Sequence, residues 1–413
     1  MDRVILHCDA NSFYASCEVA RRPELCGLPV SVGGDPEARH GIILASTPQA
    51  KACGIQTGMA LWQAYQLCPH LIILPPDFGL YTHMSSKLRA IYMDYSPYVE
   101  SYGLDECWID YTSQGITLAD GKILADILRR RARDELDICL SVGVSFNKVF
   151  AKLASDYKKP DATTIVTPDN YRSIVWPLPI SDLLNIGPKT VPKLYSHGIH
   201  TIGELARTDP AFLRSLFGKA GFMHYSHANG LDDSPVIPLG AEETIKSIGN
   251  STTTHVDMTT VEDVACVYSI LAEQVGARLR EKGLMGNCVH ISIRDTSLRC
   301  AACQQTVSPP TALAGEIERA AMQLFHTNGY AAMLPLRSIG VSVSNLQSLD
   351  APAQLDFMND HRHRDRHLAI ARCIDGLNAR FDTQMITRGN TMVSSIFSAM
   401  DHQNDHAIQS LPS

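Results

Sequence analysis

The chain has 413 residues, 45% of them hydrophobic and 19% charged, which is enough for several domains with ordinary globular cores. A net charge of −7 gives no overall attraction for nucleic acid, so such binding would depend on where individual Lys and Arg side chains lie. No apolar stretch is long enough to span a membrane, and the N-terminus lacks a basic segment followed by an apolar one, so we expect no membrane contact. The 12 cysteines are scattered, which favours reduced thiols in a cytoplasmic protein. For the close pair Cys300 and Cys303 we expect a loop or a strand end rather than a zinc site.

The first part of the chain alternates strand and helix patterns. Residues 4–9 form an apolar run that predicts a buried strand, and the Gly- and Pro-rich stretch 11–77 predicts a small insertion with many loops. The next expected elements are a helix at 78–95, two short strands between 99 and 109, a helix at 120–136, a strand at 138–144 and a helix starting near 147. This order is typical of a ferredoxin-like sheet backed by helices.

The second part predicts a helical region and then a second mixed region. Residues 168–232 are helical in pattern, and 233–245 read as a linker. The later expected elements are strands at 247–254, 287–294 and 337–343, and helices at 261–283, 311–329 and 364–380. Thr259 and Glu262 predict a capping box for the helix at 261–283, and Gly283 predicts its end.

Three carboxylates interrupt short apolar runs that favour strands. Asp9 follows 4–6, while Asp105 and Glu106 come directly before 107–109. Burying a carboxylate is costly unless something compensates its charge, and divalent cations with oxygen ligands do so. For any one of the three alone, a solvent-facing strand end or an exposed turn would be the better interpretation. Together they predict one or two metal ions, an arrangement that suits phosphoryl transfer.

Three sequence words carry a resemblance to a known family: DANSFYASCE at 9–18, YGLDECWID at 102–110 and SVGVSFNKVFAKLASDYKKPDA at 141–162. In the same order and spacing, they resemble the Y-family DNA polymerases, in particular their DNA polymerase IV (DinB) branch. The resemblance runs collinearly from about residue 3 to residue 345. It implies a template-directed DNA polymerase of low fidelity that copies past damaged template bases and is distributive without its sliding clamp.

The resemblance also implies an α+β fold, the right-hand polymerase architecture. Its parts would be a ferredoxin-like palm (1–10 and 78–166), small fingers (11–77), a helix-hairpin-helix thumb (167–232), a linker (233–245), an α/β little-finger domain (246–346) and a C-terminal tail (347–413).

By the same resemblance, catalysis would use two Mg²⁺ ions. Asp9 and Asp105 would bridge the ions, and Glu106 would complete the site of the ion at the primer 3′-OH. The backbone carbonyl of Ala10 is implied as a further ligand.

Further matches concern the incoming deoxynucleoside triphosphate. Tyr14 matches the aromatic steric gate that excludes a ribose 2′-OH, with Phe13 beside it; a core aromatic is the alternative, more so for Phe13. Lys159, directly before Pro160, matches a triphosphate-binding lysine.

The segment 47–51 departs from the family, which commonly has a Tyr followed by Arg or Lys in a word such as NYEAR. Lys51 keeps a positive charge without the two-pronged guanidinium of Arg. Pro48 supplies neither a hydroxyl nor a backbone N–H. We therefore expect weaker nucleotide binding, or a compensating donor such as Thr47 or Ser46.

Contacts with DNA and with the clamp rest on weaker patterns. The expected contacts with DNA backbone phosphates are Gly187, Lys189, Thr190 and Lys193 in a helix-hairpin-helix, and Arg294 and Arg337 further on. An ordinary helical turn and solvated surface charges remain the alternatives. Gln354, Leu355, Phe357 and Met358 resemble a clamp-binding peptide, with a chance match in a linker as the alternative.

Two rival functions use the same residues. A DNA-damage accessory protein without catalytic activity would keep the fold to bind primer-template DNA or partner polymerases, and Pro48 mildly favours it. A nucleotide cyclase with a palm fold would leave the later regions unexplained. We expect a monomeric polymerase; the sequence identifies neither the lesion bypassed nor the error spectrum.

Overall fold

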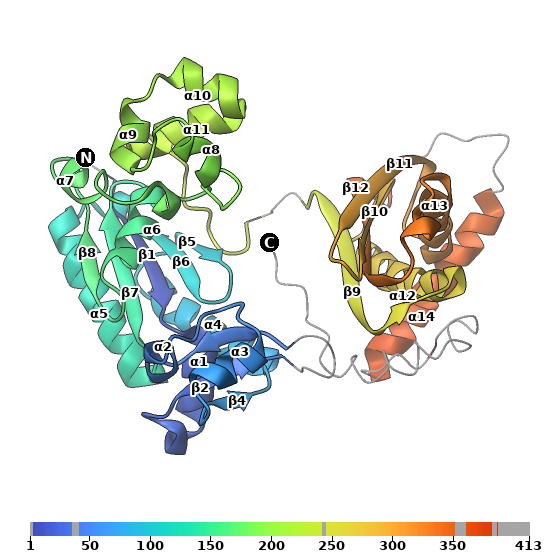
Figure 1. The fold of residues 1–413 in the computed structure, drawn as a ribbon, viewed down its shortest axis with the longest axis horizontal. Helices are drawn as coiled ribbons and strands as arrows, with labels where there is room; N and C mark the ends of the chain where they lie inside the picture. The colour runs from blue at the N-terminus through green and yellow to red at the C-terminus, as the bar shows by residue number, and fades with distance from the viewer. Residues whose placement is uncertain (1–2, 35–40, 242–244, 352–360, 382–385, 387–413) are drawn as a thin grey trace. The chain divides into compact units, whose positions relative to one another are not determined.

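The structure is a computed structural model that describes residues 3–34, 41–241, 245–351, 361–381 and 386. The chain divides into two units, the first ending at Ala241 and the second containing the described residues from 245 onward (Figure 1). Among the described helices, none is long and apolar enough to cross a membrane.

The first unit is built on a five-stranded sheet with the strand order β5-β6-β1-β7-β8. Its strands are β1 Ile5–Ala10, β5 Val99–Tyr102, β6 Glu106–Asp110, β7 Leu140–Ser145 and β8 Thr163–Ile165. The central strand β1 pairs antiparallel with β6 and β7, and β7 pairs parallel with β8. The helices of this region are α4 Phe78–Met93, α5 Leu118–Leu136 and α6 Lys148–Tyr157, and the short helix η2 Thr112–Gln114 lies between β6 and α5. The strand, hairpin and helices expected between 4 and 157 are confirmed.

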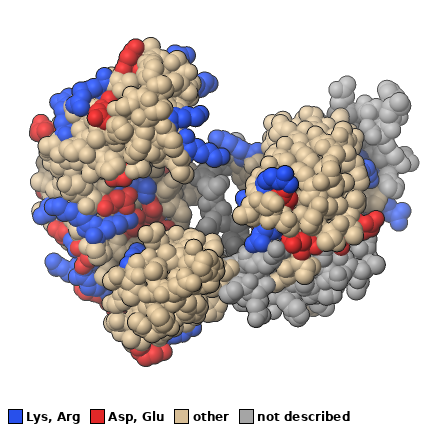
Figure 2. Space-filling model, viewed as in Figure 1, with Lys and Arg blue, Asp and Glu red and all other residues tan. Residues whose placement is uncertain are grey.

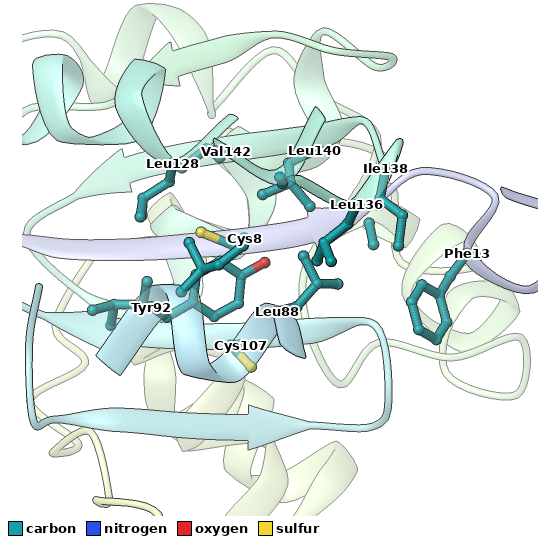
Figure 3. Packing of buried hydrophobic residues seen from close by; sticks show 14 of the residues in the cluster. Cys8, Phe13, Leu88, Tyr92, Cys107, Leu128, Leu136, Ile138, Leu140 and Val142 are labelled. Atoms are coloured by element: carbon teal, nitrogen blue, oxygen red, sulfur yellow. The ribbon is translucent and has the colours of Figure 1, made fainter. Parts of the chain in front are cut away.

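Strand β1 is buried on both faces, and its alternating side chains serve two different layers. Leu6 and Cys8 point into the core formed with α4 and α5, where Figure 3 shows Cys8 among Tyr92, Leu128 and Leu140. Residues 5, 7 and 9 therefore face the other side, which is the α6 side.

Helix α6 packs unusually close to the sheet because β7 carries a glycine beneath it. A Cβ atom on Gly143 would lie 1.9 Å from the carbonyl oxygen of Ala151, so any larger residue would push the helix away. Asn147 caps the helix by accepting a hydrogen bond from the backbone N–H of Phe150. The glycine and the cap together set the helix over the polar side chains of β1.

The insertion between β1 and α4 holds its own sheet, with the order β3-β2-β4. Its elements are α1 Phe13–Arg21, η1 Pro23–Leu25, β2 Val30–Gly33, β3 Ile43–Ser46, α2 Pro48–Ala52, α3 Leu61–Leu67 and β4 Ile72–Leu74. Glu18 ties this insertion to α4: it is fully buried, accepts from the Tyr81 hydroxyl at 2.9 Å and pairs with Arg21 and Arg22. Its charge is thus compensated within the fold.

Residues 168–232 are largely helical, as expected, around an apolar core that they share with α6. The helices are α7 Tyr171–Ile174, η3 Ile180–Asp182, α8 Val191–Tyr195, α9 Ile202–Arg207, α10 Pro210–Phe217 and α11 Lys219–Ala228.

The chain that follows α11 lies against the five-stranded sheet. The guanidinium of Arg3 donates to the carbonyl of Ser234 at 2.8 Å, and the backbone N–H of Ile237 donates to Glu100 at 2.7 Å. Val236 is buried against Trp108. The first part of the segment expected as a linker therefore packs on the first unit.

The second unit has a four-stranded antiparallel sheet with the order β11-β10-β12-β9. Its elements are β9 Ser247–Met258, α12 Val261–Glu281, β10 Leu284–Asp295, β11 Cys300–Thr311, α13 Ala314–Thr327, η4 Tyr330–Met333, β12 Leu336–Ser348 and α14 His361–Phe381. The apolar face of α12 packs on the sheet as its periodicity predicts.

One expectation for this unit is wrong, and one strand was not expected. Cys300 is the first residue of the 12-residue strand β11, a strand end as expected, and Cys303 lies three residues further along it. The strand occupies an edge of the sheet, a position that accepts Pro309 and Pro310, the residues that argue against a strand in the sequence. The capping box of α12 is Thr260 with Asp263, one residue beyond the expected pair.

Candidate active site

Strand pairing brings the three predicted carboxylates to one end of β1. Asp9 lies opposite Glu106 in the β1–β6 register, and the backbone N–H of Ala10 donates to the carbonyl of Asp105 at 2.9 Å. Asp9 is buried, and the other two are partly exposed. Residues about 100 positions apart in the chain are therefore neighbours because two short antiparallel strands pair here.

Glu106 is held by α6 and by β1. Its carboxylate pairs with the ammonium of Lys152, and its Oε2 lies 3.0 Å from Nε2 of His7, in a geometry that makes no regular hydrogen bond. Burial opposes the charged form of Glu106, but His7 and Lys152 outweigh it and lower its pKa to about 2. Burial lowers the pKa of His7, whose Nδ1 lies 2.8 Å from the Ser155 hydroxyl.

Asp9 is held by the residue that was predicted to bind triphosphate. Nζ of Lys159 donates to Oδ2 of Asp9 at 2.6 Å and lies 2.7 Å from Asp156. Burial raises the pKa of Asp9 despite this ammonium. The carboxylates of Asp9 and Asp156 outweigh the burial of Lys159 and raise its pKa.

Asp105 differs from its two neighbours, because the described residues offer its carboxylate no ion pair with Lys, Arg or His. Burial, followed by the charges of Glu106 and Asp9, raises the pKa of Asp105 to about 6. Figure 2 shows Asp and Glu atoms gathered in a recess of the first unit with Lys and Arg atoms nearby. The site thus carries excess negative charge at Asp105.

These side chains fit a divalent cation by their chemistry. Three carboxylates supply the oxygen donors that hard cations such as Mg²⁺ take in proteins. As they stand, the described His, Cys, Asp and Glu side chains include no group of three arranged to hold a metal ion. The reason is visible in the contacts, since Asp9 and Glu106 are each turned to a lysine.

The aromatic side chains expected at the nucleotide lie next to the carboxylates. The Tyr14 ring stacks on Tyr81, with centroids 4.4 Å apart, and meets Phe78 edge-on at 5.9 Å. Burial raises the pKa of Tyr14, and the nearby charge of Asp105 adds to this rise. Phe13 is 3% exposed and lies in the sheet core. Tyr14 is therefore a partly exposed ring supported by other aromatic rings, whereas Phe13 is a core side chain.

Segment 47–51 has a structural explanation for its departure from the family word. Pro48 is the first residue of α2, where a missing N–H costs no hydrogen bond. Thr47 caps that helix, and its hydroxyl donates to the carbonyl of Leu28 at 3.1 Å. The hydroxyl of Ser46 is buried against that of Ser31 at 2.8 Å. Neither hydroxyl is the free compensating donor expected above.

Lys51 is the exposed cation of this segment. Partial desolvation lowers its pKa, and the charge of Lys159 lowers it further. Two residues about 100 positions apart in the chain therefore hold positive charges close enough to influence each other. An anion that approaches both would relieve this repulsion.

The expected DNA contacts lie in separate parts of the chain. Gly187 and Thr190 form the turn before α8, in which the carbonyl of Gly187 accepts from the N–H of Thr190 at 2.9 Å, and Lys189 and Lys193 are exposed. In the second unit, Nε of Arg294 lies 3.2 Å from Sγ of Cys300, and Arg337 is partly exposed on β12. The clamp-like residues 354–358 lie outside the described residues.

Sequence reasoning missed two residues that contact the carboxylates. Lys152 lies on α6, and the spacing 152, 155 and 156 is one helical face, so a signal was present. His7 precedes Asp9 by two residues and shares its face of β1, which strand alternation also predicts.

Comparison with known proteins agrees with this fold. Sequence models of the impB/mucB/samB family and of its C-terminal domain match residues 8–156 and 245–357. A DNA polymerase IV of Acetivibrio thermocellus is 41% identical over 389 residues, which cover 94% of this chain and 97% of that protein. DNA polymerase IV 1 of Bacillus subtilis is 36% identical over 393 residues, covering 94% of this chain and 93% of that protein.

A solved structure supports the fold independently of close sequence similarity. The Y-family DNA polymerase chimera Dbh-Dpo4(243-245)-Dbh superposes with a TM-score of 0.73 at 19% identity, covering 83% of this chain and 98% of that chain. The predicted α+β polymerase fold is thereby confirmed. The chain belongs to the impB/mucB/samB family, and it is a DNA-directed DNA polymerase with the Y-family fold.

Proposed function

We propose that this protein adds deoxynucleotides to a primer 3′-OH under the direction of a template, with two Mg²⁺ ions, and that it copies past damaged template bases. The observation that carries the proposal is the excess negative charge at the end of β1 and β6, where Asp105 has no cationic partner among the described residues. Two ions at this place would stabilise the attacking 3′-oxygen and the leaving pyrophosphate.

Each side chain then has a task that follows from its position. Asp9 and Asp105 would hold both ions, and Glu106 with the carbonyl of Ala10 would complete their ligands. Lys159 and Lys51 would neutralise the triphosphate of the incoming nucleotide. Tyr14, supported by its aromatic stack, would close the space that a ribose 2′-OH needs.

The remaining regions would hold the DNA, and we assign them by resemblance. The palm would be 1–10 and 78–166, the fingers 11–77, the thumb 167–232, the linker 233–245, the little finger 246–346 and the tail 347–413. Lys189, Lys193, Arg294 and Arg337 would contact backbone phosphates. A monomer in the cytoplasm that docks on a sliding clamp through 354–358 completes the proposal.

The test is primer extension with Mg²⁺ and four deoxynucleotides on undamaged and abasic templates, with Asp105→Asn as the comparison. Loss of the carboxylate should reduce extension about a thousandfold or more, because metal stabilisation of the transition state amounts to several kcal/mol. Asp134→Asn, the same change at an exposed position of α5, should extend as the wild type does.

Two outcomes would reject the proposal in different ways. Undiminished extension by Asp105→Asn would remove the metal assignment. Tight binding of primer-template DNA by a wild-type protein that extends no primer would favour the accessory-protein alternative instead.

Sugar selection has its own test. Tyr14→Ala should increase ribonucleotide insertion relative to deoxynucleotide insertion by about 10- to 100-fold, the range over which a pocket discriminates a hydroxyl by its fit. Tyr14→Phe keeps the ring on Tyr81 and should leave the ratio unchanged. Equal ratios for Tyr14→Ala and wild type would show that the ring is no gate.

A further inference from the structure

The loop that carries Lys159 is fixed at one residue. Asp161 adopts a left-handed backbone conformation with φ of 53°, which costs energy for any residue other than glycine and which Asp and Asn tolerate best. Only Pro160 lies between Asp161 and Lys159, whose ammonium meets Asp9. Whatever holds Asp161 therefore limits where the Lys159 side chain can reach.

From outside, Asp161 is held by two arginines of α5. Nη2 of Arg129 donates to Oδ1 of Asp161 at 2.8 Å and also to its carbonyl oxygen, and Arg133 pairs with Oδ2. The Arg129 side chain is 19% exposed and that of Asp161 33% exposed, so this pair is only partly screened by water. The guanidinium of Arg129 thus binds both the side chain and the main chain of Asp161.

A second set of bonds anchors the arginine itself. Nη1 of Arg129 donates to Asp126 at 3.1 Å and to Thr163 of β8 at 3.3 Å, while the Thr163 hydroxyl donates to Asp126 at 2.7 Å. The Arg129 side chain is therefore anchored both to α5 and to β8, the strand that follows the loop. This is more order than an isolated surface ion pair provides.

Asp161 is also hydrogen-bonded to Asn11, the residue that directly follows β1, the strand that carries Asp9. Its backbone N–H donates to Oδ1 of Asn11 at 2.9 Å. Asn11 is itself fixed, since its amide nitrogen donates to the Ser141 hydroxyl at 3.0 Å and its backbone N–H to the carbonyl of Cys139 at 2.9 Å. Asn11 comes two residues after Asp9 in the chain, so one hydrogen bond connects the segment of the carboxylate with the loop of the lysine.

We infer that Asp161, held between Arg129 and Asn11, is a positioning residue that sets Lys159 for the triphosphate of the incoming nucleotide. This rests on the proposed function, in which Lys159 binds that triphosphate. The Asp161 carboxylate acts through Lys159, since among the described residues it meets Arg129 and Arg133 and none of the candidate site residues. It should therefore affect nucleotide affinity and leave the chemical step nearly unchanged.

The test is a double-mutant cycle between Asp161 and Lys159. Asp161→Asn keeps a residue that tolerates the left-handed backbone and removes the charge that the arginines hold. We expect it to raise both the KM and the dissociation constant for a deoxynucleoside triphosphate by about 3- to 10-fold, with kcat within about twofold. In a Lys159→Met background the same change should alter either constant by less than about twofold.

Two further variants separate positioning from general damage to the fold. Arg129→Gln removes the same ion pair by changing the arginine and should reproduce the effect of Asp161→Asn. The inference can therefore be tested even if one variant folds poorly. Arg130→Ala is the matched control, because Arg130 is exposed on the same helix and lines the same surface hollow as Arg129 and Arg133. It should leave nucleotide affinity unchanged.

The outcomes distinguish this inference from the proposed function. Dissociation constants are measured with Mg²⁺ and without turnover, so a protein that binds nucleotide but extends no primer would reject the proposed function while the cycle still reports on Asp161. Wild-type affinity in both Asp161→Asn and Arg129→Gln would overturn the inference. So would an equal loss of affinity with and without Lys159, or no loss in Lys159→Met alone.

Discussion

Arg280 in the second unit is a buried charged group and Asp105 in the first is a partly buried one, and their surroundings differ. The Arg280 side chain is 3% exposed, and it meets both oxygens of Asp375 at 2.6 and 2.8 Å and the carbonyl of Ala312 at 2.7 Å. Asp105 has no such partner among the described residues, and its pKa is raised to about 6 by burial, with Glu106 and Asp9 adding to the rise.

The difference between these two residues indicates how a charge that stabilises the fold can be distinguished from one that serves a binding site. A buried ion whose hydrogen bonds and charge are all satisfied within the fold connects secondary-structure elements, as Arg280 connects α12 to α14. A partly buried carboxylate without a counter-ion, such as Asp105, makes the protein alone less stable, and the lost free energy is recovered only when a cation binds. Unfolding measurements can therefore distinguish the two kinds of site.

The largest effect on stability is expected when the ion pair between Arg280 and Asp375 is broken. Asp375→Ala leaves the Arg280 guanidinium buried without its carboxylate, which should lower the free energy of unfolding by about 2 to 4 kcal/mol. Denaturant unfolding measures the change, and amide hydrogen exchange in α12 and α14 locates it. Asp365→Ala makes the same change at an exposed position of α14 and should stay within about 0.5 kcal/mol of the wild type. Equal stability of the two variants would contradict a structural role for the pair.

Replacing Asp105, which has no counter-ion among the described residues, should change the free energy of unfolding in the opposite direction. The pKa of Asp105 in the folded protein is above its ordinary value of 3.8, so the folded state binds this proton more tightly and loses stability as pH rises from about 4 to 6. Without divalent cations at about pH 8, Asp105→Asn should therefore be more stable than the wild type, by roughly 1 to 3 kcal/mol, since one pKa unit corresponds to about 1.4 kcal/mol. Thermal or denaturant unfolding in the presence of a chelator measures this.

The neighbouring residue provides a control of opposite sign. The pKa of Glu106 is lowered, because His7 and Lys152 favour its charged form over the effect of burial, so Glu106→Gln should destabilise the protein under the same conditions. Added Mg²⁺ should stabilise the wild type and reduce the advantage of Asp105→Asn. Destabilisation by both substitutions would show that Asp105 is balanced by the fold after all.

The sequence was sufficient to predict the carboxylate site, because strand patterns place Asp9, Asp105 and Glu106 at strand ends. It was also sufficient for most helices and strands, whose apolar periodicity is strong. It was insufficient for β11, since edge strands need little periodic burial and tolerate prolines. It also could not show that Thr47 and Ser46 are occupied, because their partners Leu28 and Ser31 come from an adjacent strand and loop.

The contacts that hold Asp161 beside Lys159 could not be predicted from the sequence, for a different reason. Arg129 and Asp161 are 32 residues apart, on a helix and in a loop, and no periodic pattern relates two such positions. In the sequence Arg129 is one of several arginines that read as a solvated helix face. Only the packing of α5 beside β8 distinguishes it from Arg130.

The smallest expected effect is on the metal requirement, and it follows from the same unbalanced carboxylate. A cation at Asp105 must displace the proton that this group holds below about pH 6, so the half-saturating Mg²⁺ concentration should rise about tenfold per pH unit below that value and stay constant above about pH 7. Glu106, whose pKa is lowered, should add nothing in this range. Primer extension titrated with Mg²⁺ between about pH 5 and pH 8 measures this requirement. A constant requirement over that range would mean that Asp105 is already ionised at pH 5, and its charge would then have to be balanced within the protein, as that of Arg280 is.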